Sequence, residues 1–354
     1  MANLTTLSTL SIISVGARTP LGLNAAASAA AYRAGLSGHG LHPVFVDKTG
    51  DAIRTVRDGL LDPILASDER MVAMASTAIE EACAPLFERG KPPVALYLAT
   101  PEPRPGWDES DGLRLTRAVR RSAERFVDVR SAHSLPRGHA AGLLALEYAQ
   151  RELESGQVAA VLVGGVDSYL DGVTIEWLDE RRELASSTNI GGFCPGEAAS
   201  FVVVTTPTIA RASGVRGVSE VLAVASAVEV HTIDSDSVCV GEALSQVVQT
   251  ASSVFAASGL PASAMYCDIN GQRYRNEELM YLATRLPAGH IDDVTNYAMP
   301  ASSFGDIGAA SGPLALVLAH QSAARGYAAG PHCMVWGSSI GGTRVAAALR
   351  LGGT

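Results

Sequence analysis

The sequence predicts an α/β fold in which strands and helices alternate along a single chain of 354 residues. Short apolar runs typical of buried strands alternate with longer segments that repeat apolar residues at helical spacing. The composition is 47% hydrophobic and 18% charged, which suits one large or two medium cores and argues against long disordered stretches. We therefore expect parallel β-α-β units.

The clearest unit of this kind runs from Arg137 to Ser168. A small-residue turn at 137–142 opens an apolar helix pattern that continues through Glu154, and a buried strand follows at 158–163 before a double glycine. The first amide groups of a helix stabilise negative charge, so enzymes often place a nucleophile at such a turn. The residue at this turn is His139.

The chain before this unit follows the same alternation. Asn24 is placed to cap an alanine-rich helix, because its side-chain oxygen can accept from the first free amides. The loop at 100–106 contains three prolines, which remove backbone donors and stiffen the connection. The predicted elements are a strand at 10–15, the helix to about 34, a helix within 62–85, and strands at 92–99 and 126–129.

The chain after the unit predicts a second set of strands and helices. Pro313 suits the first turn of a helix, where a missing N–H costs nothing. The predicted strands are 201–205, a set within 218–230, 265–269, 333–336 and 344–349; the predicted helices are 241–256, 277–286 and 313–320. Glycine-rich turns are expected at 303–312 and 337–342.

Charge and cysteine content limit the functional classes. The chain has 27 basic and 36 acidic residues, a net charge of −9, which gives no support for nucleic-acid binding. The five cysteines are widely spaced, without a Cys-x-x-Cys pair, so neither a zinc site nor a disulfide framework is indicated. No stretch reaches the roughly 18 apolar residues of a spanning helix, and a basic leader is absent. We expect a cytoplasmic protein with no membrane span.

A basic segment lies between Arg114 and Arg125, with Arg117, Arg120 and Arg121 at helical spacing. The favoured interpretation is a solvated helix face. The alternative is a contact for an acidic partner, such as a carrier protein and its phosphopantetheine arm.

The unit at 137–168 resembles the nucleophile helix of the β-ketoacyl-[acyl-carrier-protein] synthases, which have the thiolase fold. That family reads roughly Ala-Cys-Ser-Ser-Gly, then a helix ending in Gly, a strand and Gly-Gly. Laying Gly156 and Gly164-Gly165 on this pattern puts His139 on the catalytic cysteine. The Pro-Gly-Glu-Ala-Ala segment at 195–199 is similar to the family's Pro-Gly-Glu-Gly-Ala.

This resemblance covers most of the chain and implies two similar β-α-β halves stacked as α-β-α-β-α layers. It divides one compact unit into an N-terminal half, 1–212, and a C-terminal half, 213–354, although no sequence repeat between them is obvious. It implies a homodimer, and an acyl carrier protein or acyl-CoA as partner in fatty acid or polyketide biosynthesis. No cofactor or metal is expected, because the histidines lack metal-ligand spacing.

The family's catalytic histidines align with other residues here. The first, in His-Gly-Thr-Gly-Thr, aligns with Asn270, and the second, in Gly-His before Gly-Ala-Ala-Gly, aligns with Asp306. The family's Gly-Phe-Gly-Gly turn, which helps form the oxyanion hole, appears as Ser339 to Gly342. The resemblance thus implies a site of His139, Asn270 and Asp306. The oxyanion amides would be those of His139, Ile340 and Gly341.

These replacements predict altered chemistry. An asparagine can still orient a carbonyl, but an ionised aspartate only accepts hydrogen bonds and would repel a developing oxyanion. Without a thiol at position 139 an acyl chain has no attachment point for condensation. The first hypothesis is therefore a non-condensing pseudoenzyme of this fold, kept as a scaffold or for binding a partner or acyl group. The resemblance separately implies an accessory role, with a protein of a bacterial secretion or biosynthesis locus as the partner.

The alternative is an altered enzyme that uses His139. An imidazole can act as nucleophile or base, with Asp306 holding its tautomer, and would serve an acyltransferase, a decarboxylase or a hydrolase. Cys194 and Cys267 lie near the motifs as substitutes for the nucleophile, but neither begins a predicted helix. Glu197 is expected to be a buried structural carboxylate, and His133 a surface or structural residue.

Overall fold

The computed structural model describes residues 3–5, 9–88, 90–187, 189–214 and 218–352. Its strands are β1 (Asn3–Thr5), β2 (Leu10–Arg18), β3 (Gly40–Val46), β4 (Ala52–Thr55), β5 (Pro93–Ala99), β6 (Asp128–Leu135), β7 (Ala160–Ser168), β8 (Glu197–Thr205), β9 (Ser219–Val228), β10 (Ala264–Tyr266), β11 (His332–Ser338) and β12 (Thr343–Leu351).

The α-helices are α1 (Ala25–Arg33), α2 (Ser67–Phe87), α3 (Glu109–Ala123), α4 (Ala141–Glu154), α5 (Gly172–Glu180), α6 (Pro207–Ala212), α7 (Glu242–Ser258), α8 (Arg273–Arg285), α9 (Ala301–Phe304) and α10 (Ser311–Ala324). Two 3₁₀ turns, η1 (Gly138–Ala140) and η2 (Gly308–Ala310), lead directly into α4 and α10. Asn24 caps α1 as expected, since its side chain accepts from the Ala27 amide at 2.7 Å. None of the described helices is both long and apolar enough to span a membrane.

A ten-stranded sheet carries the fold among the described residues, in the order β10-β11-β12-β9-β2-β8-β7-β5-β6, with β1 paired to β9. β5 runs parallel to β6 and β7, and β10 runs parallel to β11. The parallel pairs are those expected of β-α-β units, whereas the other pairs in this sheet are antiparallel, so the sheet is mixed. Helix–strand alternation does not set strand direction: β11 and β12, for example, are joined by a short turn, which only antiparallel neighbours allow.

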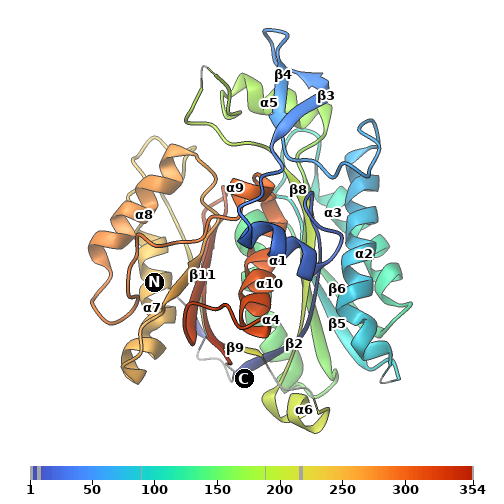
Figure 1. Cartoon of the computed structure of the whole chain (residues 1–354), viewed down its shortest axis with the longest axis vertical. Helices are drawn as coiled ribbons and strands as arrows, with labels where there is room; N and C mark the ends of the chain where they lie inside the picture. Colours follow the sequence, from blue (N-terminus) through green and yellow to red (C-terminus); the bar gives the residue numbers. More distant parts are fainter. Residues whose placement is uncertain (1–2, 6–8, 89, 188, 215–217, 353–354) are drawn as a thin grey trace.

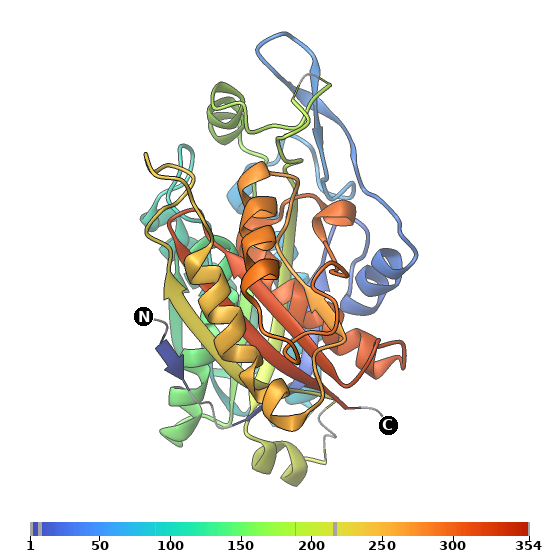
Figure 2. The ribbon, with the colours of Figure 1, turned by 90° about the vertical axis from the view of Figure 1, so that its left-hand side faces the viewer.

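The sheet bends around two central helices. Figure 1 shows α4 and α10 between two arms of the sheet, with α2 and α3 outside one arm and α7 and α8 outside the other. In Figure 2, α7 and α8 lie in front of the strands that they cover. α10 is buried around nearly its whole circumference, as expected of a helix enclosed between two arms of a sheet. The expected α-β-α-β-α layers are therefore confirmed.

The two halves share a local repeat at their central helices. Gly138-His139-Ala140-Ala141-Gly142 and Gly308-Ala309-Ala310-Ser311-Gly312 occupy equivalent places, each forming a 3₁₀ turn and the start of a helix of 14 residues. Both turns begin with a glycine at positive φ, 58° and 48°, a conformation that side chains disfavour. This short repeat went unnoticed in the sequence because only small residues and glycines carry it.

Several elements differ from the sequence expectations. β6 runs to Leu135 instead of ending near 129, and β7 continues through the double glycine to Ser168. The ring of Phe201 covers Gly164, where an added Cβ would lie 2.0 Å from the ring, so this glycine is a strand position rather than a strand end. The β3–β4 hairpin was not predicted, because its exposed strands lack a clean alternation of apolar residues. The division at 212/213 stays a prediction.

Candidate functional site

His139 lies in η1, at the head of α4, and is 2% exposed. Its Nε2 is 2.8 Å from Asp306 Oδ1. An ionised carboxylate can only accept, so Nε2 carries the proton and donates it to Asp306. Among the described residues, Nδ1 has no hydrogen-bond partner. The imidazole is therefore oriented through one nitrogen only.

Asp306 is the centre of this cluster. Its Oδ2 accepts from Asn270 Nδ2 at 2.5 Å, and its Oδ1 also accepts from the Gly308 amide at 2.8 Å. Burial by itself raises the pKa of Asp306, but the charge and hydrogen bond of His139, with Arg275 and the Gly308 amide, hold that pKa well below its usual range. The three residues singled out from the sequence thus lie in direct contact around an ionised carboxylate.

Arg275 adds a buried cation that the sequence analysis did not identify. It is 2% exposed, and its Nη1 donates to Asp268 Oδ2 at 2.6 Å and to the Ser338 carbonyl at 2.8 Å. Its Nη2 lies 3.5 Å from His139 Nε2. Because Arg275 belongs to α8 in the C-terminal half and His139 to η1 in the N-terminal half, this approach crosses from one half to the other. Only the tertiary fold brings these segments together.

Two of the three cluster residues are buried. The side chains of His139 and Asp306 are 3% and 2% exposed, whereas Asn270 is half-buried. A cavity of about 10 Å³, lined by Asn270, Asp306 and Cys267 among others, adjoins the carboxylate. That volume holds roughly one water molecule.

The turn between β11 and β12 contains the amides that the resemblance assigned to an oxyanion hole. The Ile340 amide donates to Glu102 Oε2 and the Gly341 amide donates to Glu102 Oε1, each at 2.9 Å. One carboxylate of the same chain therefore accepts from both amides. The sequence analysis gave Glu102 no role; the only local signal was the proline-rich loop that carries it.

A second ion pair holds the neighbouring 3₁₀ turn. Arg104 donates to Asp167 Oδ1 at 2.7 Å and stacks over the Tyr169 ring at 4.2 Å. The other oxygen of Asp167 accepts from the Ala309 amide at 2.9 Å. Asp167 lies near the end of β7 and is 1% exposed, so this pair links the N-terminal sheet to the start of α10.

The cysteines that were weighed as substitute nucleophiles are buried. The Cys194 thiol donates to the Arg54 carbonyl, and burial raises its pKa to about 12. Burial likewise raises the pKa of Cys267, whose thiol donates to the Ala298 carbonyl. Both are therefore neutral thiols near neutral pH, and the thiolate is the nucleophilic form. Neither lies at the head of α4.

Two further expectations can be compared with the structure. Glu197 is fully buried and accepts from Arg70 Nε at 2.8 Å and from the Asp58 amide at 2.8 Å, so the expected buried carboxylate is confirmed. His133 is exposed on β6 and stacks on Tyr97 with ring centroids 4.7 Å apart.

The structure brings together two glutamates and a cysteine, a group that was not predicted from the sequence. Glu229, Cys239 and Glu278 place ligand-type atoms within 4.8 Å of one another, a separation that would suit a metal ion. Arg344 Nη2, however, is 2.8 Å from Glu278 Oε1, so a buried guanidinium already supplies positive charge there. We assign the group no ligand.

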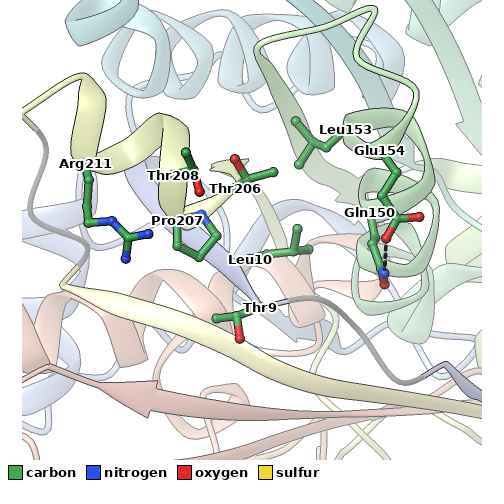
Figure 3. Close-up of a pocket in the computed structure, with 9 residues that line it drawn as sticks. All are labelled: Thr9, Leu10, Gln150, Leu153, Glu154, Thr206, Pro207, Thr208 and Arg211. Atoms are coloured by element: carbon green, nitrogen blue, oxygen red, sulfur yellow. Dashed lines mark hydrogen bonds between the residues drawn. The ribbon is translucent and has the colours of Figure 1, made fainter.

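A separate cavity of about 360 Å³ lies at the other end of α4. Figure 3 shows its lining, which combines the last turns of α4 with the start of β2 and of α6. Gln150 Nε2 donates to Glu154 Oε1 at 2.6 Å within it. Because His139 is at the head of α4 and this cavity is at its tail, the cavity does not give access to the cluster.

Comparison with known proteins gives a consistent structural result. No protein-family model and no curated protein sequence matches the chain. An oxazolomycin ketosynthase domain from Streptomyces albus is similar with a TM-score of 0.75 and 15% identity over 98% of this chain and 74% of that one. The ishigamide ketosynthase/chain length factor gives 0.70 and 21% identity over 98% and 100%.

A third solved structure is a ketosynthase bound to a hexaketide in complex with its type II polyketide synthase acyl-carrier protein. It gives a TM-score of 0.76 and 13% identity, over 98% of this chain and 100% of that one. At these low sequence identities, the structural similarity shows that the chains share a fold. This chain, with His139 and Asp306 beside the starts of the central helices and Asn270 in the loop before α8, has the thiolase-like ketosynthase fold.

Proposed function

We propose that this protein is a non-condensing ketosynthase-fold protein that acts by binding another protein. The observation that carries the proposal is the buried contact between His139 and Asp306 at the head of α4. Condensation needs a nucleophile that holds an acyl chain as a stable thioester. An acyl-imidazole hydrolyses readily, so His139 does not replace a thiol in that role.

The charge of the cluster supports the same proposal. Asp306 is held ionised by its neighbours, and a fixed negative charge at this place raises the energy of a developing oxyanion. Each carboxylate oxygen of Asp306 accepts at least one hydrogen bond, as is usual for a buried polar group that has a structural role.

We include a homodimer in the proposal and place its interface at β6, where the β6 strands of two chains would pair. β6 forms one end of the strand order and runs for 8 residues, whereas β10 at the other end has only 3. An edge strand presents unpaired backbone groups that a second chain can pair with. One similar structure is a ketosynthase/chain length factor, so a related ketosynthase chain is the alternative occupant of this edge.

An acyl carrier protein is the proposed partner outside the dimer. Arg117 and Arg121 are exposed one turn apart on α3, and no described acidic residue pairs with them. Arg125 continues the same stripe just beyond the helix. Unpaired cations on a protein of net charge −9 favour an acidic partner. A ketosynthase of this fold has been solved in complex with its acyl-carrier protein.

The test combines pure protein with acyl- and malonyl-loaded carrier protein. Intact-mass spectrometry should show no acyl adduct on the protein, and no β-ketoacyl product should form. A ketosynthase with its cysteine, assayed in parallel, verifies the carrier proteins. Detection of condensed product from the pure protein would refute the proposal.

The hydrogen bond between His139 and Asp306 favours one second candidate, a hydrolase, acyltransferase or decarboxylase. A carboxylate that holds Nε2–H leaves Nδ1 as the basic nitrogen. This enzyme would lose turnover of an acyl thioester in both His139→Ala and Asp306→Asn. Unchanged turnover in both variants removes the candidate.

A further inference from the structure

The Glu102 carboxylate is bound across two successive amides as an anionic ligand would be. Its two oxygens accept from Ile340 N–H and Gly341 N–H at 2.9 Å each. We propose that these two amides form a binding site for the carboxylate group of a ligand, and that the chain closes this site with Glu102. We call the two amides the carboxylate cradle.

Glycines let the carboxylate approach this closely. A Cβ added at Gly341 would lie 2.6 Å from Glu102 Oε1, and one added at Gly138 would lie 3.0 Å from Glu102 Oε2. An alanine at position 341 would require the carboxylate oxygen to shift, and one at position 138 would crowd the other oxygen. The cradle is thus shaped to the size of a carboxylate on both sides.

The cradle is rigid, so its donors stay aimed at the same point. The Ser339 amide donates to the Thr343 carbonyl at 2.8 Å and closes the turn. The Ser339 hydroxyl donates to the Arg137 carbonyl and accepts from the Ala140 amide at 3.0 Å, which fixes the turn to η1. Fixed amide dipoles bind an anion without reorganising.

The loop that carries Glu102 is anchored on either side of it. The Thr100 carbonyl accepts from the Gly138 amide at 3.1 Å, and Arg104 is paired with Asp167. Glu102 itself is half-buried, and its described hydrogen bonds are those to the cradle. Its side chain can therefore rotate away and a ligand carboxylate can enter, while the loop keeps its place.

This inference goes beyond the proposed function, because it concerns a ligand with a carboxylate group and not the surfaces that bind a partner protein. Two parallel amide bonds match the two oxygens of one carboxylate, whereas a thioester carbonyl offers a single oxygen. The cradle would accordingly take a ligand with a free carboxylate. Its position beside η1 places that ligand next to the His139 segment.

The experiment follows the Ile340 amide by NMR in protein labelled with [¹⁵N]isoleucine, with acetate as the probe. An Ile340→Val variant identifies the resonance. In Glu102→Ala the Ile340 proton should move upfield, because its hydrogen bond is lost, and acetate should move it back saturably. Half-saturation in the wild-type protein should need at least about tenfold more acetate, because Glu102 competes; tenfold corresponds to about 1.4 kcal/mol.

A second variant opens the cradle without changing Glu102. Gly341 does not have a positive φ, so Gly341→Ala is tolerated by the backbone but displaces the carboxylate oxygen. The Ile340 proton should then shift upfield as in Glu102→Ala. Glu109→Ala, which removes an exposed carboxylate on α3, should leave the resonance at its wild-type position.

The inference is overturned if acetate leaves the Ile340 resonance of Glu102→Ala unmoved, or if wild-type protein saturates at the same acetate concentration. It is also overturned if Gly341→Ala leaves the resonance where the wild-type protein has it. Condensed product from the pure protein would defeat the proposed function and leave these titrations unchanged, so the two failures are distinguishable.

Discussion

The residue that most affects the chemistry of this protein is Asp306. Its carboxylate joins an imidazole, an amide side chain and a backbone amide, and each of these groups donates to it. A carboxylate with a donor on each oxygen holds its surroundings in one arrangement, and this supports the proposal that the cluster is structural.

The first prediction concerns acid stability. The folded-state pKa of Asp306 is depressed below its unfolded value, so its contribution to stability is present above the unfolded pKa of about 3.9 and is lost as pH falls toward the folded value. Asp306→Asn should remove that pH dependence. The measurement is the melting temperature between about pH 2 and 6, where the wild-type minus variant difference should shrink as pH falls. Asp236→Asn, at an exposed site, is the control.

A second prediction restores the missing thiol. His139→Cys should not condense acyl chains, because Asp306 still places negative charge where the oxyanion would develop. The assay is product formation from acyl- and malonyl-loaded carrier protein, with the protein's intact mass recorded alongside. Condensed product from this single variant would show that the cysteine alone was missing and that Asp306 is harmless.

At the scale of elements, the two central helices begin in contact with each other. A Cβ added at Gly142 in α4 would lie 2.3 Å from Pro313 Cγ in α10. The same closeness positions η1 against η2, and with them His139 against the segment that contains Asp306. The geometry of the cluster therefore depends on the packing of these helix starts.

The third prediction tests that packing. Gly142→Ala should destabilise the protein by about 1–3 kcal/mol, the usual cost of overpacking a tight core. Gly172→Ala is the matched control, since nothing lies within 4 Å of an added Cβ there and its φ is not positive. Urea unfolding curves of the two variants give their free energies of unfolding. Equal midpoints for Gly142→Ala and Gly172→Ala would contradict the prediction, because the contact between α4 and α10 would then tolerate an added methyl group.

At the scale of the whole molecule, both proposed partners contact surfaces on the N-terminal half. β6 is an open sheet edge and the arginine stripe lies on α3, which covers that arm of the sheet. The cluster of His139, Asn270 and Asp306 joins residues of both halves. The proposed partner surfaces are therefore on other elements than the cluster.

The fourth prediction addresses the dimer. His133 is exposed on β6. We place the two-fold axis of the proposed dimer near the middle of this strand, where the side chain of His133 would approach its own copy. His133→Glu should therefore weaken the dimer, because like charges facing each other across paired strands repel. Light scattering should report the monomer mass of 36.7 kDa for this variant and twice that for the wild-type protein. His231→Glu, in an exposed loop away from β6, should remain dimeric.

The fifth prediction concerns the carrier protein. Reversing the charge of Arg117 and Arg121 together should weaken binding of an acyl carrier protein at least about tenfold at low salt, and less at high salt because exposed charges are screened. Titration calorimetry at a low and a high salt concentration measures the loss of affinity under each condition. The double reversal of Arg33 and Arg325, near α1, should have no such effect. Equal affinities for both double variants would locate the contact elsewhere.

Much of the fold could be predicted from sequence because it depends on local patterns. The helix cap at Asn24, the apolar run of β5 and the small-residue turn before α4 are each encoded within a few residues. The limits of β6 and β7 could not be predicted, since they depend on strands that pair with them from distant parts of the chain. Arg275 and Glu102 were missed for the same reason.

The sequence alone determined which side chains stand at positions 139, 270 and 306, and that none of them is a thiol, because residue identity needs no fold. The tertiary structure decided that these three side chains touch, that Arg275 joins them, and that Glu102 accepts from the amides of Ile340 and Gly341. Such contacts join residues up to 239 positions apart, and only the packing of both halves around α4 and α10 brings them within hydrogen-bond distance.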